Sequence, residues 1–160
     1  MIIARVAPII RALAMHLDPA LIHSLARTAG TPFWLYDGDV IRRRIRDIQS
    51  LTSSAGMQAR YAMKACSVWK VLEEMKQHDI WIDAVSGNEV LRALRAGYSA
   101  GQEPPAICFT ADVFRDNALD VIRAHGILPN IGSPGMIAQL QAAGSRGAIS
   151  IRVNPGFGHG

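Results

Sequence analysis

The sequence has few cysteines and no long apolar run, and each shortage excludes a class of protein. Its 160 residues include two cysteines, Cys66 and Cys108, which lack the spacing of a metal site or of a disulfide framework. The apolar N-terminal segment is interrupted by Arg5, Pro8 and Arg11, well short of the roughly 20 apolar residues that a membrane span requires. Arg11 also falls where a signal peptide needs an unbroken apolar core. We therefore expect a cytoplasmic protein with reduced thiols and no membrane partner.

The charge balance is mildly basic, with 17 Lys and Arg against 13 Asp and Glu and a net charge of +4. Four of the arginines cluster on a predicted helix, at positions 42, 43, 44 and 46. No aromatic residues interleave with them, and no glycine-rich or zinc motif accompanies them. This pattern favours a solvent-exposed helix face over a nucleic-acid interface. At 49% hydrophobic and 19% charged residues, the composition is that of one globular domain with a core.

From residue 57 onward, a short apolar run, a polar or small residue and a helical pattern recur in the same order. The runs are MQARYAMKA, IWIDAVS, AICFT, ILPNIGS and AISIRVNP. Their last polar or turn residues lie 22 to 24 positions apart, at Lys64, Ser86, Thr110, Ser133 and Pro155. Such spacing fits one strand, one helix and two short loops for each unit.

Helix start and stop signals fall between these runs. Ser86 and Glu89 form a capping box, in which we expect the glutamate to accept from the N–H of Ser86 itself. Ser133 precedes a proline and predicts a second start, and Asp112 predicts a third, for a helix that includes Val113. The expected stops are Gly97, Gly126 and Gly144.

Alternating strands and helices predict a parallel sheet, either doubly wound or closed into a barrel. A doubly wound nucleotide-binding sheet needs a glycine-rich loop after its first strand, but Cys-Ser-Val-Trp follows YAMKA there. The one glycine-rich stretch, NPGFGHG, spans positions 154–160. We therefore predict an α/β fold of the TIM (β/α) barrel type with about five βα units. The barrel is partial, because closing one takes about eight strands.

Polar residues gather where the predicted strands end, which is where β/α barrels build active sites. They are Lys64, Asp83, Ser86, Thr110, Asn130, Arg152 and Asn154. Polar side chains also end strands simply because loops are polar. Lys64 differs, since a strand lysine next to Ala62 and Met63 would be desolvated, which favours the neutral, nucleophilic amine. The alternative is a lysine whose amine extends to the solvent-exposed rim.

The segment YAMKAC at 61–66 resembles the pyridoxal phosphate lysine motif of the alanine-racemase-like decarboxylases, Tyr-Ala-x-Lys-Ala-Asn. Cys66 replaces the asparagine, as in one branch of the diaminopimelate decarboxylases. Four other segments resemble these enzymes in the same order: GTPFWLYD at 30–37, IDAVSGNEVLRALRAGY at 82–98, FTADV at 109–113 and IRVNPGFGHG at 151–160.

The resemblance implies pyridoxal 5'-phosphate as cofactor and Lys64 as the catalytic lysine that forms a Schiff base with it. It implies that Asp83 lies near this Schiff base and that Arg152 lies beside Asp83 and the phenolic side of the cofactor. Each could instead form a structural ion pair. The implied substrate is meso-diaminopimelate, decarboxylated to L-lysine by a homodimer. Residues 30–160 would form the N-terminal part of the barrel, and residues 1–29 a segment tied to a β-domain.

Several alternatives stay open. His159 does not match the ring-stacking histidine of these enzymes, and Cys66 and Cys108 are expected to be packing residues. The substrate could be another basic amino acid, such as ornithine, arginine or carboxynorspermidine. The chain could also be a non-catalytic remnant that acts by association with another protein. Because five strands cannot close a barrel, we expect no decarboxylation by the 160-residue chain alone.

Overall fold

The computed structural model describes residues 18–153, 155 and 156. The chain divides into two compact units, residues 1–47 and 48–160, and the boundary falls inside a helix. The N-terminal apolar segment, Asn154 and His159 lie outside the described residues.

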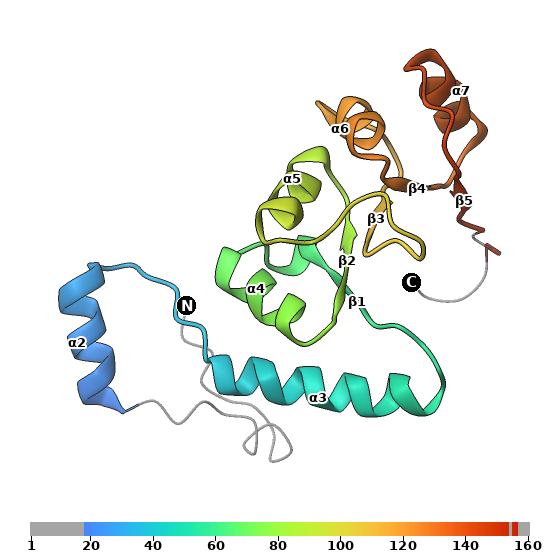
Figure 1. Cartoon of the computed structure of the whole chain (residues 1–160). Coiled ribbons are helices and arrows are strands. Elements are labelled where there is room, and N and C mark those ends of the chain that lie inside the picture. Colours follow the sequence, from blue (N-terminus) through green and yellow to red (C-terminus); the bar gives the residue numbers. More distant parts are fainter. Residues whose placement is uncertain (1–17, 154, 157–160) are drawn as a thin grey trace. The chain divides into compact units, whose positions relative to one another are not determined.

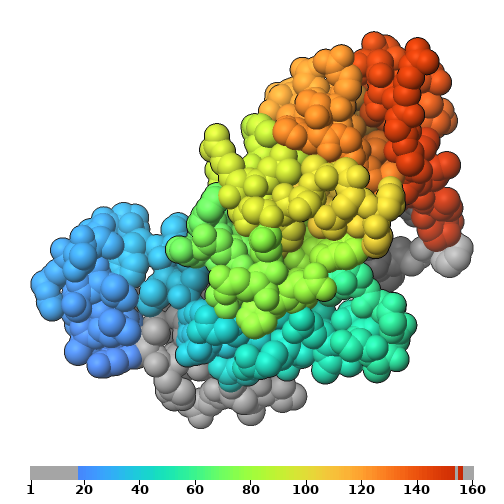
Figure 2. Space-filling view, in the orientation of Figure 1, coloured from blue at the N-terminus to red at the C-terminus, as the bar shows by residue number. Residues whose placement is uncertain are grey.

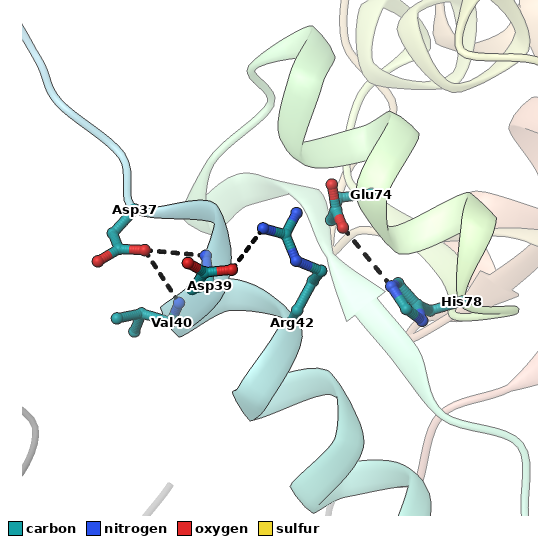
Figure 3. Close-up of polar contacts among 6 residues, drawn as sticks. All are labelled: Asp37, Asp39, Val40, Arg42, Glu74 and His78. Carbon is teal, nitrogen blue, oxygen red and sulfur yellow. Dashed lines mark hydrogen bonds and ion pairs between the residues drawn. The ribbon is translucent and has the colours of Figure 1, made fainter.

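The first unit contains two helix starts, each capped by an aspartate. Helix α2 (Pro19–Ala29) begins after Asp18, whose carboxylate accepts from the backbone N–H of Ala20. Helix α3 (Gly38–Ser54) begins after Asp37, whose carboxylate accepts from the N–H groups of Asp39 and Val40 at 2.8 and 3.2 Å (Figure 3). These three hydrogen bonds satisfy N–H groups that a helix leaves unpaired at its start.

The arginine cluster lies on α3, as predicted. Arg43, Arg44 and Arg46 are exposed, and Arg44 pairs with Asp47 at 3.0 Å. Arg42 pairs with Asp39 at 2.7 Å, one turn earlier in the same helix (Figure 3). The cluster therefore includes a solvated helix face with short-range ion pairs, which contribute little to stability when exposed.

The second unit is built on a five-stranded parallel sheet (Figure 1). Its strands are β1 (Arg60–Ala62), β2 (Trp81–Ala84), β3 (Ile107–Thr110), β4 (Leu128–Ile131) and β5 (Ser150–Ile151). Their order in the sheet is the order in the chain, β1-β2-β3-β4-β5. A doubly wound sheet reverses direction at a switch point, whereas a β/α barrel adds each strand beside the previous one. The predicted partial barrel of about five βα units is confirmed.

Four helices alternate with the strands and cover one face of the sheet. They are α4 (Trp69–Gln77), α5 (Gly87–Arg95), α6 (Ala118–His125) and α7 (Pro134–Ala142). In the space-filling view they follow one another from green through orange to red (Figure 2). The strand residues beneath them, such as Ile82, Phe109 and Ile131, are buried and form the core with Leu72 and Val90. Burying these apolar side chains is the main force that holds helices to sheet.

Helix α5 starts as the capping box predicts, with one difference. The hydroxyl of Ser86 accepts from the N–H of Glu89 at 3.2 Å, which confirms the first half. The carboxylate of Glu89 accepts from the N–H of Val85 at 2.8 Å, one residue before the expected position. The carboxylate thus ties the last residues of the strand to the helix that follows. Gly87 allows this helix to approach the next, because a Cβ there would lie 3.1 Å from the Cα of Ala118.

The other helix signals had mixed outcomes. Ser133 is the N-cap of α7, and Gly97, Gly126 and Gly144 follow their helices with positive φ angles, as expected. The prediction for Asp112 is wrong, since α6 begins at Ala118 with Asn117 as its N-cap. Val113 lies before the helix and is exposed. The Asp112 carboxylate pairs with Arg152 instead, which competes with a capping role.

The end of α4 is also tied by polar contacts. The imidazole of His78 lies 3.5 Å from the carboxylate of Glu74, one turn earlier (Figure 3). The backbone carbonyl of His78 accepts from the side-chain amide of Gln49 at 2.6 Å.

Among the described helices, none is both long and apolar enough to cross a membrane.

Candidate functional site

The face of the sheet opposite the helices carries polar side chains at its carboxyl-end edge. In β2 and β3, residues that face the helices are buried and their neighbours along the strand are half-buried. The strand register sets Ala62, Asp83 and Cys108 side by side, and Thr110, Asn130 and Ser150 one level further along. The polar members of both levels are half-buried. The sequence-predicted residues Asp83, Thr110 and Asn130 therefore share one face.

Lys64 lies in a single turn of 3₁₀ helix, η1 (Met63–Ala65), directly after β1. This is the expected end of the strand, two residues beyond Ala62, which is in register with Asp83. The expected desolvation is absent, because Lys64 is exposed and only Met63 beside it is buried. The chain leaves the strand before Lys64, so the neighbouring strand does not cover its side chain. Lys64 has no ion pair with another described residue.

Asp83 contributes a negative charge to the middle of this face. Its effect is seen at Cys108, its partner in β3. Burial raises the pKa of the Cys108 thiol, Arg60 lowers it, and the carboxylates of Asp83 and Glu103 raise it again. Cys108 is therefore held as a neutral thiol. This agrees with the expected packing role better than with a reactive thiolate.

Arg152 lies at the end of β5 but pairs with a different carboxylate from the one expected. Its backbone N–H donates to the carbonyl of Ile131 at 2.8 Å, and its guanidinium lies 3.1 Å from the carboxylate of Asp112. The guanidinium thus pairs with Asp112 in this structure, and its position beside Asp83 stays a prediction. Asp112, just after β3, is the carboxylate within reach.

Arg60 lies on the same face of the sheet as Asp83, and the sequence analysis did not identify it. Its guanidinium donates to the carbonyls of Ile82 and Pro105 and lies 4.9 Å from the centre of the Trp81 ring. It thereby ties β1 to β2 and to the start of β3. The available signal was an arginine at the first position of a strand, two residues before the predicted active-site edge.

Three cavities of about 180, 470 and 270 Å³ lie near the opposite edge of the sheet, where the strands begin. Their linings include Ile127 before β4, Ile149 before β5 and Ile80 before β2. The carboxyl-end edge that carries Lys64 is distinct from them. Within the described part of the chain, no group of three or more His, Cys, Asp or Glu side chains is placed to bind a metal.

Comparison with known proteins decides which family this arrangement represents. The family model described as "Pyridoxal-dependent decarboxylase, pyridoxal binding domain" matches residues 38–160. The chain belongs to the pyridoxal-dependent decarboxylases. Pyridoxal phosphate is thereby confirmed as the cofactor of the family that the sequence resembles.

Individual pyridoxal-dependent decarboxylases match over most of this chain. A diaminopimelate decarboxylase from Streptomyces coelicolor is 40% identical over 90% of this chain and 32% of its own length. A crystal structure of a diaminopimelate decarboxylase superposes with a TM-score of 0.75 and 37% identity, covering 87% of this chain and 32% of that one. A lysine decarboxylase from Selenomonas ruminantium superposes with a TM-score of 0.72 over 90% of this chain and 38% of that one. At 17% identity, the last shows the fold alone.

The chain spans about a third of the length of the curated relatives it matches. The residues present fit part of a pyridoxal phosphate site. Lys64 offers an exposed amine at the carboxyl end of β1, and Asp83 offers a half-buried carboxylate on the neighbouring strand. Arg152 supplies a guanidinium at the same edge. An amine can react with the aldehyde of pyridoxal phosphate, and a carboxylate can stabilise positive charge on the cofactor. A guanidinium can bind one of its anionic oxygens.

Proposed function

We propose that this chain contributes the cofactor lysine, Lys64, to a pyridoxal phosphate-dependent decarboxylation of meso-diaminopimelate that yields L-lysine. The observation that carries the proposal is the place of Lys64. It lies in the turn directly after the first strand of a sequentially ordered parallel sheet, with an exposed amine and no described ion-pair partner, in a member of this enzyme family. When bound, pyridoxal phosphate supplies an aldehyde for an amine and a ring that accepts the electron pair left by the departing carboxylate.

The roles of the other residues follow from the same face. Asp83 would hold positive charge near the Lys64 amine, because its strand is hydrogen-bonded to β1. Arg152 would present its guanidinium to an anionic oxygen of the cofactor, with Asp112 fixing its direction. Lys64, Asp83 and Arg152 are thus the proposed cofactor contacts in this chain.

The choice of substrate rests on the curated relatives. The relatives at 37 to 40% identity are named diaminopimelate decarboxylases. Decarboxylases of other amino acids match this structure at lower identity, including lysine decarboxylase at 17% and ornithine decarboxylase at 16%. Diaminopimelate is therefore favoured over other basic amino acids.

The wider organisation is proposed on the same basis. Residues 30–160 would form the N-terminal part of the cofactor-binding barrel, and residues 1–29 a segment tied to a β-domain. The complete enzyme would act in the cytoplasm as a homodimer. One observation supports the alternative, a non-catalytic chain that associates with another protein: apolar side chains near the last strand, Ile151 and Val153, are largely exposed.

Labelling by the cofactor itself tests the proposal, and the chain carries its own controls. It contains three lysines, Lys64, Lys70 and Lys76. Lys70 is exposed but pairs with Glu73 at 2.6 Å. The purified chain is incubated with pyridoxal phosphate, reduced with borohydride and digested with trypsin. An adduct on Lys64 blocks cleavage there and gives the modified peptide 61–70, whereas adducts on Lys70 or Lys76 give peptides 65–76 or 71–92.

We expect the adduct to lie predominantly on Lys64 and to be lost in a Lys64→Arg variant. Equal labelling of the three lysines, or labelling of Lys70 and Lys76 alone, would show that the Lys64 amine is not selected by the cofactor and would overturn the proposal.

A further inference from the structure

Among the contacts of the described residues, three hold the turn that carries Lys64 from outside its own backbone. Beneath it, the side chain of Met63 is buried in the core with 1% of its surface exposed. After it, the hydroxyl of Tyr61 donates to the carbonyl of Cys66 at 2.9 Å. Beyond that, the guanidinium of Arg92, from α5, lies 3.3 Å from the carbonyl of Ser67. Lys64 itself lies between these fixed points.

The contact from Tyr61 is the shortest of the polar ones and is partly buried. Tyr61 is in register with Ile82, so it shares the helix-covered face of the sheet, and its ring packs against the core. Its hydroxyl therefore has a fixed origin, unlike the guanidinium of Arg92, which sits on an exposed side chain. A half-buried ring that packs on the core and carries one polar atom is well suited to hold a backbone group in place.

The acceptor is a group that needs a partner. Cys66 is the C-cap of η1, and the carbonyls at a helix end have no acceptor role within the helix. Tyr61 and Cys66 flank the turn on either side, so their hydrogen bond closes a loop around Lys64. Loss of this bond would loosen the turn while Met63 still anchors its first residue.

We propose that Tyr61 is a positioning residue for Lys64, because its hydroxyl fixes the turn that presents the lysine amine at the carboxyl end of β1. The importance of that position for the cofactor rests on the function proposed above. The mechanical part, that the Tyr61 hydroxyl holds residues 63–67, stands on the structure alone.

A matched pair of variants tests this inference. Tyr61→Phe removes the hydroxyl that reaches Cys66. Tyr98→Phe removes an equally short bond, from the Tyr98 hydroxyl to the carbonyl of Ile80 at 2.8 Å, away from the turn. Both variants lose a tyrosine hydroxyl that donates to the backbone. The loss at Tyr98 is the more severe one, because its hydroxyl is buried and also lies 3.4 Å from the carbonyl of Leu72, so an effect confined to Tyr61→Phe is not one of general stability. Amide hydrogen exchange of residues 63–67 is measured first, without cofactor, followed by the distribution of the reduced pyridoxal phosphate adduct among the three lysines.

For Tyr61→Phe, we expect exchange at residues 63–67 to be faster by about fivefold, the factor that one typical hydrogen bond provides. We also expect the share of adduct on Lys64 to fall. Tyr98→Phe should leave both measurements at the wild-type level.

Unchanged exchange at residues 63–67 in Tyr61→Phe would overturn the inference, whatever the labelling shows. Faster exchange with an unchanged share on Lys64 would also overturn it, since the bond would then be structural only. If the wild-type chain itself shows no preference for Lys64, the proposed function fails. Faster exchange confined to residues 63–67 in Tyr61→Phe would then still support Tyr61 as the residue that holds the turn.

Discussion

At the scale of single residues, charged side chains near the face of the sheet opposite the helices change the pKa of Cys108. Asp83 lies beside Cys108 in register, and Arg60 reaches across the start of the same strands. Burial raises the pKa of Cys108, Arg60 opposes this, and Asp83 and Glu103 add to it. The reactivity of the Cys108 thiol therefore depends in part on the charge of Asp83. Asp83 is one of the proposed cofactor contacts.

Substituting Asp83 tests this coupling. In Asp83→Asn, the carboxylate that helps to raise the pKa of Cys108 is gone, so more thiolate is present at a given pH. We expect alkylation of Cys108 by iodoacetamide near neutral pH to be faster than in the wild type, because the thiolate is the reacting form. Peptide mass spectrometry follows the reaction, with Cys66 in the same chain as the reference.

The raised pKa of Cys108 also predicts how the stability of the fold changes with pH. Because the pKa of Cys108 is raised in the folded chain, folding favours the protonated thiol, and its contribution to stability is lost as the pH rises above the ordinary value of 9.0. An alkylation rate of Cys108 that is the same in the wild type and in Asp83→Asn would contradict the coupling.

Residue-level chemistry was only partly predictable. The sequence placed Lys64 at a strand end because apolar residues precede it and a helix follows. It did not reveal that the chain turns into η1 before Lys64 and so leaves it exposed. The pairing of Arg152 with Asp112 depends on which strands are neighbours, and local patterns carry no such information.

At the scale of elements, two helices start with a serine in nearly the same backbone conformation. Ser86 has φ −147° and ψ 157°, and Ser133 has φ −152° and ψ 153°. The hydroxyl of Ser86 accepts a bond from Glu89, whereas Ser133 makes no such side-chain capping bond in the structure. Two serines at the same helix position thus differ in whether their hydroxyls make a capping hydrogen bond.

This difference predicts unequal costs of removing the hydroxyls. Ser86→Ala should lower the free energy of unfolding by about 1 kcal/mol, the usual value of a capping bond. Ser133→Ala should lower it by only a few tenths of that amount. Urea unfolding followed by circular dichroism measures both, and equal losses would show that the capping bond at Ser86 contributes nothing.

Elements were the most predictable level of this protein. A repeat of strand and helix every 22 to 24 residues identified five strands, since each unit must bury one apolar face. The start of α6 was missed because Asp112 resembles an N-cap, although Asn117 occupies that position. Only the competing ion pair with Arg152 explains why Asp112 is unavailable.

At the scale of the whole molecule, helices α4 to α7 cover one face of the sheet, and the side chains on the other face are only half-buried among the described residues. Apolar side chains near its last strand, Ile151 and Val153, are 69% and 80% exposed. A β/α barrel buries both faces of its sheet, and five strands do not close one. Substrate selection and exclusion of water need that enclosure.

The 160-residue chain should therefore form no lysine from meso-diaminopimelate, even when Lys64 carries the cofactor. The measurement is amino-acid analysis after incubation with pyridoxal phosphate and substrate, with an intact diaminopimelate decarboxylase as the positive control. Lysine production above that of the Lys64→Arg variant would show that the open face is sufficient for chemistry.

The sequential order of the strands has a consequence for how the second unit is made. Each strand pairs with the strand synthesised just before it, and the paired residues lie 20 to 25 positions apart in the chain. Among the five described strands, none of the four pairings joins distant parts of the sequence. On the ribosome, each new unit can dock as soon as it emerges, so the sheet grows at one edge in step with translation.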